Sequence, residues 1–198
     1  MIAVFGGAFN PPTIAHYEVA KHLLGLPFVE SLLFVPVGDH YNKAGLIPAF
    51  HRVKMLEIMV SNLSNARISK VEIDAVQALK TLETLEKIQN KYPKEQLAFV
   101  MGADNLCGLT NWYKYEKLIE MFKIIIVNRG EVDVYQLIEE KFSFATTNFL
   151  VIDDFIKMDI SSSQYRDDLT KGELLLPAVV AYIEKHGLYR VLDGILEI

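Results

Sequence analysis

The stretch MIAVFGGAFNPPTIAH, residues 1–16, decides the fold of this chain. It begins with apolar residues typical of a buried strand and continues with two glycines, Gly6 and Gly7, and two adjacent prolines. Residues with helical spacing follow, and we expect a helix to begin near Thr13. A glycine turn that joins a strand to a helix start offers unpaired main-chain N–H groups to an anion. The stretch therefore predicts a phosphate-binding turn after the first strand.

Six short apolar runs indicate strands, and segments with helical spacing lie between them. This alternation predicts an α/β fold with a parallel, doubly wound sheet, because parallel neighbours need a crossover and helices must cover both faces. Ligands of such sheets bind beyond the carboxyl ends of the strands. The predicted strands are residues 2–5, 31–37, 66–73, 97–103, 123–129 and 148–153, and the predicted helices include residues 16–24, 51–60, 81–90 and 115–121.

No strand pattern is evident after residue 155, where two helices are expected to close the chain. Serines at 161–163 are typical of a helix cap, and Pro177 and Gly187 bracket a second helical segment. We therefore interpret residues 1–198 as a single domain, with an α/β core over 1–155 and a small C-terminal helical part over 156–198.

Composition narrows the possible partners of the protein. A net charge of −5 and a pI near 5.6 argue against a broad basic surface for nucleic acid, although a local basic cluster can still bind a small phosphate compound. No window approaches the about 20 apolar residues of a membrane span, and the first residues do not resemble a secretory signal. A single cysteine argues against an internal disulfide and a thiolate-rich zinc site. We expect a cytoplasmic protein without a membrane partner.

Thr13 and His16 are the polar candidates in the predicted phosphate turn. Residues three apart lie on one face of a helical turn, so both side chains can point back toward a bound phosphate. A histidine there donates a hydrogen bond or carries charge near neutral pH. The alternative is that His16 is an ordinary surface or capping residue.

The heptapeptide ISSSQYR, residues 160–166, is the second candidate anion site. Hydroxyl groups and free amides at a helix start, with the Arg166 guanidinium about a turn and a half later, favour an anion. The alternative is a common N-cap in which only one serine matters. Two anion sites in one small α/β domain suggest a polyphosphate ligand.

Polar and aromatic residues near the fourth predicted strand suggest how the rest of a nucleotide would bind. Asp104 is placed to accept hydrogen bonds from ribose hydroxyls, as acidic residues do in dinucleotide folds, or else it caps a helix. Trp112 and Tyr113 can stack on a flat ring, or they are core or interface aromatics. The long polar loop 38–48 contains Lys43, and Arg52 begins the next helix; both are either ligand cations or solvated charges.

The motifs together resemble a known family. GGAFNPPTIAH, residues 6–16, resembles the first signature of the nucleotidyltransferase superfamily, and ISSSQYR resembles its partner signature. Within that superfamily the chain is similar to the nicotinate- and nicotinamide-mononucleotide adenylyltransferases. The segments that carry this similarity are PVGDHYNKAGLIPAFHR (36–52), KTLETLEKI (80–88), GAD (102–104), NWY (111–113) and VVAYIEKHGLY (179–189), with Lys80 where the family usually has tyrosine.

This resemblance implies adenylyl transfer, in which the 5′-phosphate of a pyridine mononucleotide attacks the α-phosphorus of ATP and pyrophosphate leaves. It implies ATP and a pyridine mononucleotide as partners and Mg²⁺ bound to ATP, with no metal ligands from the protein. A homo-oligomer is compatible with the sequence. The sequence leaves open whether the mononucleotide carries nicotinate or nicotinamide.

The resemblance also implies site residues. His16 would stabilise charge on the α-phosphate, Thr13 would donate a phosphate hydrogen bond, and Arg166 and Lys43 complete the expected catalytic set. The expected ATP-binding residues are Gly6, Gly7, Ala8, Phe9, His16, Gly102, Asp104, Ile160, Ser161, Ser162 and Arg166. The expected residues for the mononucleotide are Lys43, Arg52, Thr81, Thr84, Trp112 and Tyr113.

Two other functions remain compatible with the motifs. One is another small-molecule nucleotidyltransferase similar to the pantetheine-phosphate adenylyltransferases, which are usually shorter and lack the tryptophan segment. The other is a nucleotide-binding sensor that has lost catalysis, and His16 together with the complete ISSSQYR motif argues against it. Turnover of ATP with a mononucleotide distinguishes these alternatives.

Overall fold

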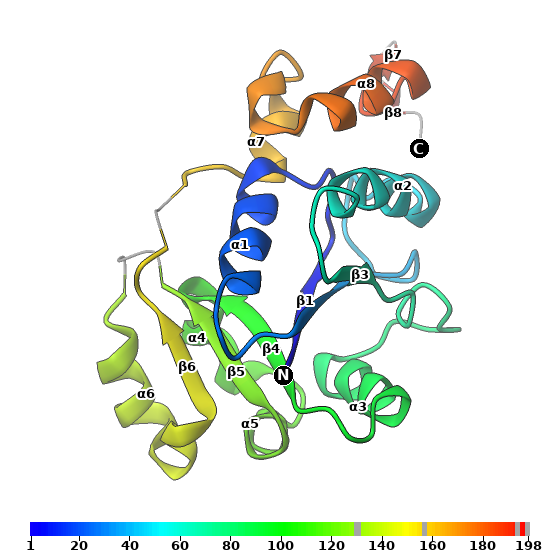
Figure 1. Ribbon diagram of the computed structural model, residues 1–198. Helices are drawn as coiled ribbons and strands as arrows, with labels where there is room; N and C mark the ends of the chain where they lie inside the picture. The colour runs from blue at the N-terminus through cyan, green and yellow to red at the C-terminus, as the bar shows by residue number, and fades with distance from the viewer. Residues whose placement is uncertain (129–131, 156–157, 193–194, 197–198) are drawn as a thin grey trace.

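The computed structural model describes residues 1–128, 132–155, 158–192 and 195–196 (Figure 1). Residue 129, at the end of the fifth predicted strand, and residues 156–157, at the start of the predicted C-terminal part, lie outside these ranges. The strands are β1 (Ile2–Gly7), β2 (Ser31–Pro36), β3 (Ala66–Ile68), β4 (Leu97–Gly102), β5 (Lys123–Val127), β6 (Phe149–Ile152), β7 (Val191–Leu192) and β8 (Ile195–Leu196).

Helices follow most of the strands, as the apolar spacing predicts. They are α1 (Ile14–Leu24), α2 (Ala49–Val60), α3 (Thr81–Lys91), α4 (Ala103–Gly108), α5 (Tyr115–Met121), α6 (Val134–Phe142), α7 (Ser162–Asp167) and α8 (Pro177–His186), with 3₁₀ turns at Leu109–Asn111, Ser143–Asn148 and Gly172–Leu174. Within the described ranges, no helix is long and apolar enough to cross a membrane.

The first six strands of the described chain form one parallel sheet in the order β3-β2-β1-β4-β5-β6. This confirms the predicted doubly wound fold. The strand order reverses between β1 and β4, so the connections on either side diverge and leave a crevice beyond the carboxyl ends of these two strands. The crevice lies where Gly6 and Gly7 end β1 and Gly102 ends β4.

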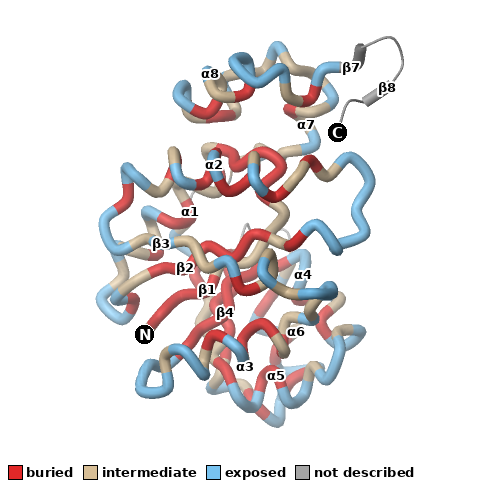
Figure 2. Tube along the Cα trace, turned by 90° about the vertical axis from the view of Figure 1, so that its right-hand side faces the viewer, coloured by how far each residue is buried: buried red, intermediate tan, exposed pale blue. Residues whose placement is uncertain are grey.

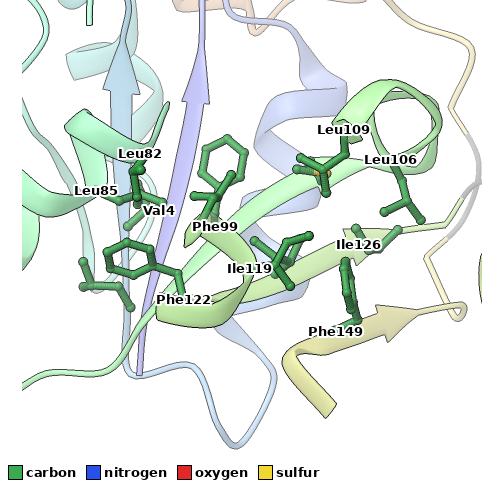
Figure 3. Close-up of a cluster of buried hydrophobic side chains, with 14 of the residues drawn as sticks. Val4, Leu82, Leu85, Phe99, Leu106, Leu109, Ile119, Phe122, Ile126 and Phe149 are labelled. Carbon is green, nitrogen blue, oxygen red and sulfur yellow. The ribbon is translucent and has the colours of Figure 1, made fainter. Parts of the chain in front are cut away.

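Successive residues of each strand point to opposite faces of the sheet, and both faces are covered by helices. On one face, Val4 and Phe99 pack with Leu82 and Leu85 of α3 and with Ile119 of α5 (Figure 3). On the other face, the strands pack against α1 and α2. Buried residues therefore concentrate in the sheet between two helical layers (Figure 2). Each large apolar side chain buried there contributes about 1.5–3 kcal/mol.

The strand β3 is shorter than predicted, because it ends at Ile68 rather than at residue 73. It is an edge strand whose partner in the sheet is β2, and the amide of Ser69 makes the last bond, to the oxygen of Phe34. Farther along β2 stands Pro36, which has no N–H to donate to a ladder. The chain therefore leaves the sheet after Ser69, and residues 70–80 reach across the carboxyl ends of the strands.

The C-terminal helices pack on the outer side of α2, above the layer formed by α1 and α2 (Figures 1 and 2). Met55 of α2 lies in a third apolar cluster with Val179 and Ile183 of α8. The expectation that strands end at residue 155 is wrong, because β7 and β8 pair antiparallel.

Candidate active site

The predicted phosphate turn connects the end of β1 to α1, with Thr13 at the N-cap position. Phe9 adopts a left-handed backbone conformation with φ of 48°, and its ring is 1% exposed beneath the turn. A Cβ on Gly7 would lie 3.1 Å from that ring, so glycine allows the turn to close over it. Phe9, expected in the ATP site, therefore packs behind the turn, where its ring meets that of His16 at a centroid distance of 5.2 Å.

His16 is held by the start of its own helix. The main-chain N–H of Thr13 donates to His16 Nδ1 at 3.0 Å, and Thr13 Oγ1 lies 2.7 Å from the same nitrogen. Because Nδ1 accepts from a main-chain N–H, it carries no proton, and a neutral imidazole then has its proton on Nε2. The half-buried ring is thus fixed as an Nε2–H donor at the phosphate turn.

The second motif lies directly against the first, as Figure 1 shows for the starts of α7 and α1. The hydroxyl of Ser162 donates to the main-chain oxygen of Pro11 at 2.7 Å. Arg166 donates to the main-chain oxygen of Asn10 at 2.7 Å and to Ser163 Oγ at 3.0 Å. Two motifs far apart in sequence therefore form one polar surface, as their chemistry suggested.

Ser161 and Ile160 precede the helix at this surface. Ser161 is the N-cap of α7: its hydroxyl accepts from the amide of Gln164 at 3.2 Å, and its own amide donates to Gln164 Oε1 at 2.6 Å. Its side chain thus caps the helix, as in the simpler of the two interpretations, while Ile160 is half-buried immediately before it. The contacts of Ser162 and Arg166 hold this segment, including Ile160 and Ser161, beside the phosphate turn.

Asn10 is a central residue of the site that the sequence did not single out. Its side chain is 1% exposed and donates to the oxygen of Gly45 at 2.7 Å. Its Oδ1 accepts from Tyr189 Oη at 3.0 Å and from the amide of Ile47 at 3.4 Å. Together with Arg166, these bonds connect the turn to loop 38–48 and to the C-terminal part. The only signal in the sequence was an asparagine before two prolines.

Arg52, expected to bind the mononucleotide, lies beneath the turn instead and is 0% exposed. Its guanidinium donates to the oxygen of Ile47 at 2.8 Å, to the oxygen of Ala8 at 3.1 Å and to Asp39 Oδ1 at 3.1 Å. Burial lowers the pKa of Arg52, and the hydrogen bond to Asp39 acts against that shift. The geometry makes Arg52 a support for the turn and loop 38–48, away from the cleft surface.

A cleft of about 910 Å³ opens beside the turn, at the carboxyl ends of the central strands. Loop 38–48, the segment before α3 and the residues around Trp112 form its other walls. The sequence-predicted residues in its lining are Gly6, Gly7, Ala8, Lys43, Thr81, Thr84, Trp112 and Tyr113. The remaining predicted residues of the phosphate motifs, Thr13, His16, Ile160, Ser161, Ser162 and Arg166, lie outside this lining.

The aromatic wall of the cleft is built on the sheet. Trp112 is half-buried and packs edge-on against Phe99, with ring centroids 6.0 Å apart. Tyr113 is 45% exposed, and Lys114 Nζ lies 5.0 Å from its ring centroid. Trp112 therefore packs against the core and also lines the cleft. It fits the interpretation as a core aromatic as well as the interpretation as a residue that can stack on a flat ring.

At the end of β4, Gly102 and Asp104 lie close together. A Cβ on Gly102 would be 2.3 Å from Asp104 Oδ1, so the carboxylate occupies the space that a side chain would fill. Gly102 caps α4 from the N-terminal side, and Asp104 is exposed in its first turn. Both lie at the reversal of strand order, opposite Gly6 and Gly7 across the crevice.

Glu72 and Thr84 form a polar pair inside the cleft that the sequence did not predict. Thr84 is 4% exposed, and its hydroxyl donates to Glu72 Oε1 at 2.7 Å. Burial raises the pKa of Glu72, and the hydrogen bond from Thr84 acts in the opposite direction. Gly38 lets the Glu72 segment approach, because a Cβ there would lie 2.3 Å from the main-chain oxygen of Glu72.

No group of three or more His, Cys, Asp and Glu side chains in the described ranges could hold a metal ion. The cations near the site include Lys43 and Lys80 in the cleft lining and Arg166 at the phosphate turn. The arrangement therefore offers main-chain amides, hydroxyls, an imidazole and a guanidinium, which are groups that bind and orient phosphates.

Comparison with known proteins identifies the family of this chain. The family described as "Cytidylyltransferase-like" matches residues 4–168. A protein of Acholeplasma laidlawii described as "Probable nicotinate-nucleotide adenylyltransferase" is 35% identical over 96% of this chain and 97% of its own length. The nicotinate-nucleotide adenylyltransferase of Bacillus subtilis is 28% identical over 95% of this chain and 97% of its own.

A solved structure is also similar. The nicotinic acid mononucleotide adenylyltransferase of Plasmodium falciparum, complexed with NaAD, superposes with a TM-score of 0.80 at 26% identity, covering 95% of this chain and 96% of that chain. The chain therefore belongs to the cytidylyltransferase-like family of nucleotidyltransferases and, within it, to the nicotinate-nucleotide adenylyltransferases.

Proposed function

We propose that this protein transfers AMP from ATP to the 5′-phosphate of nicotinate mononucleotide. An oxygen of that phosphate forms a bond to the α-phosphorus of ATP, the bond from the α-phosphorus to the bridging oxygen breaks, and pyrophosphate leaves with the electron pair. The observation that carries the proposal is the contact between Arg166 and Asn10, which puts the two phosphate motifs at the reversal of strand order beside the cleft.

Such a reaction needs positioning and charge stabilisation more than a protein nucleophile. In this proposal the Nε2–H of His16 stabilises charge on the α-phosphate, and the Thr13 hydroxyl donates to His16 Nδ1 and so supports that imidazole. Arg166 and Ser162, with the amides that begin α7, bind the β- and γ-phosphates. In the structure, Ser162 and Arg166 donate to main-chain oxygens of the turn. Bound ATP would therefore replace these oxygens as the acceptors or share the donors with them.

The nucleoside parts fit the two sides of the crevice. Gly6, Gly7 and Ala8 allow close approach of a nucleotide, and Asp104 is available to accept from the adenosine ribose. The cleft beside them takes the mononucleotide, with the pyridine ring against Trp112 and the phosphate toward Lys43. Magnesium enters the proposal as the counter-ion of ATP, where it neutralises phosphate charge and is bound mainly by phosphate oxygens.

Incubation of the protein with ATP, magnesium and nicotinate mononucleotide tests the proposal. Pyrophosphate and the dinucleotide should appear in equal amounts, measured by a coupled phosphate assay and by chromatography. Phosphopantetheine in place of the mononucleotide should give no turnover. Absence of pyrophosphate with both nicotinate and nicotinamide mononucleotide would overturn the proposal.

A further inference from the structure

The pair formed by Glu72 and Thr84 has no role in the phosphate chemistry, yet both residues line the cleft that also contains Trp112. The buried Thr84 hydroxyl lies 2.7 Å from Glu72 Oε1. A carboxylate held against a single hydroxyl controls where the hydrogen of that hydroxyl points. The direction of this hydrogen bond therefore decides which ligand groups the Thr84 hydroxyl can bond.

A threonine hydroxyl has one hydrogen to donate and two lone pairs. When Glu72 is ionised, it can only accept, so Thr84 donates to Glu72 and presents lone pairs to the cleft. When Glu72 is protonated, its own O–H donates to Thr84 Oγ1, and the Thr84 hydrogen becomes available to a ligand. The protonation state of Glu72 thus decides whether Thr84 is a donor or an acceptor.

The two pyridine mononucleotides differ in the same respect. A nicotinate carboxylate only accepts hydrogen bonds and carries a negative charge, whereas a nicotinamide group both donates and accepts. We propose that Glu72, acting through Thr84, selects the pyridine substituent, with the protonated form favouring nicotinate and the ionised form favouring nicotinamide. This inference rests on the proposed function and makes Glu72 a positioning residue of the cleft.

The surroundings of Glu72 shift its carboxyl group toward the neutral form, and the hydrogen bond from Thr84 acts against that shift. The main chain of Glu72 lies against Gly38, just after β2, its side chain accepts from Thr84 in α3, and burial raises its pKa. A nicotinate anion bound beside it would favour the protonated form further, because like charges repel. The other titratable side chains that line the cleft are His40, Tyr41 and Lys43 from loop 38–48, Lys80 from the residue before α3, and Tyr113 beside Trp112.

The ratio of kcat/KM for nicotinate mononucleotide to kcat/KM for nicotinamide mononucleotide, measured between pH 6 and pH 9, tests the inference. Both substrates carry the same 5′-phosphate and use the same ATP site, so titrations of the phosphate groups and of the ATP site cancel in the ratio. In the wild-type protein the ratio should fall by up to about tenfold for each pH unit above the pKa of Glu72.

Glu72→Gln supplies a permanently neutral side chain whose amide can donate to Thr84. Its ratio should be independent of pH and stay near the low-pH value of the wild type. Thr84→Val should reduce the nicotinate preference and weaken its pH dependence, whereas Thr84→Ser should retain both. His40→Gln, a change at the histidine of the cleft lining, is the control variant and should keep the wild-type pH dependence.

The results separate this inference from the proposed function. Turnover of neither mononucleotide overturns the proposed function and this inference with it. Turnover with a ratio that does not change with pH, or a Glu72→Gln protein that keeps the wild-type pH dependence, overturns this inference alone. A purely structural role of Glu72 would lower kcat/KM for both substrates equally and leave the ratio unchanged. If Glu72→Gln does not fold, the comparison of Thr84→Val with Thr84→Ser decides the question.

Discussion

Arg166 donates to the main-chain oxygen of Asn10 at 2.7 Å, and this bond joins residues 156 positions apart. Arg166 lies in α7, the first helix after the α/β core, and Asn10 lies in the turn that follows β1. The bond therefore positions a guanidinium at the turn without a contribution from the sheet itself. It explains why a motif outside the core belongs to the same site as the first motif.

Replacing Arg166 with alanine should raise the KM for ATP by at least about tenfold, because a charge-assisted contact to phosphate is lost. Arg166→Lys should recover only part of the effect, since lysine lacks the planar fork that addresses two acceptors. Steady-state kinetics with ATP as the varied substrate measure the change. An unchanged KM for ATP in a folded Arg166→Ala protein would remove Arg166 from the triphosphate site.

His16→Ala should lower kcat by about 10² or more, as expected for loss of a donor to developing charge. His16→Asn is the matched control, because its Oδ1 can still accept from the Thr13 amide while the Nε2–H donor is lost. Both variants should lose turnover, and only His16→Ala should also lose the contact at the helix start. Single-turnover assays and thermal unfolding separate the two effects; normal turnover in His16→Asn would contradict this role.

Arg52→Met should destabilise the protein by about 2–6 kcal/mol, at about 1–3 kcal/mol for each main-chain acceptor that is left without its donor. The main-chain oxygens of Ala8 and Ile47 would lose their buried donor. Urea unfolding measures the difference, and Arg67→Met, an exposed change on β3, should stay within about 0.5 kcal/mol. Equal midpoints for the two variants would show that Arg52 does not support the turn.

Glu72→Gln should gain stability over the wild type as pH rises. Burial raises the pKa of Glu72 in the folded protein, so between the ordinary and the raised pKa the native state binds more protons than the unfolded chain. The free energy of unfolding then falls with rising pH, and the loss is complete above the raised pKa. Urea midpoints of both proteins from pH 4 to pH 8 should diverge in favour of glutamine; parallel curves would contradict the shift.

The sequence predicted the six strands of the sheet, because strands buried on both faces appear as continuous apolar runs. The alternation of strands and helices predicted that these strands run parallel, but it did not predict their order in the sheet. The end of β3 was not predictable locally, since it depends on Pro36 in a neighbouring strand. The pair β7 and β8 was not predicted, because strands of two residues are too short to show a strand pattern. Local spacing therefore decides which elements form, while pairing decides where they end.

For the site, the motifs predicted which segments meet but not what each side chain does there. Arg52 was interpreted from its charge, and only the three-dimensional fold reveals that its donors are directed to the main-chain oxygens of Ile47 and Ala8 and to the Asp39 carboxylate. Asn10 and Glu72 act through residues distant in sequence, and no spacing rule connects them. Their contacts follow from the meeting of loop 38–48, the segment before α3 and the C-terminal part.

Tyr189 donates to Asn10 across 179 positions of sequence, and Arg166 donates to it across 156. During synthesis on the ribosome, the phosphate turn emerges long before either of these partners exists. The nascent chain can form its first strands and helices, but the turn then lacks the two contacts that fix Asn10. A chain that ends before Arg166 would lack both contacts at Asn10, and under the proposed function it would bind ATP more weakly than the full-length protein.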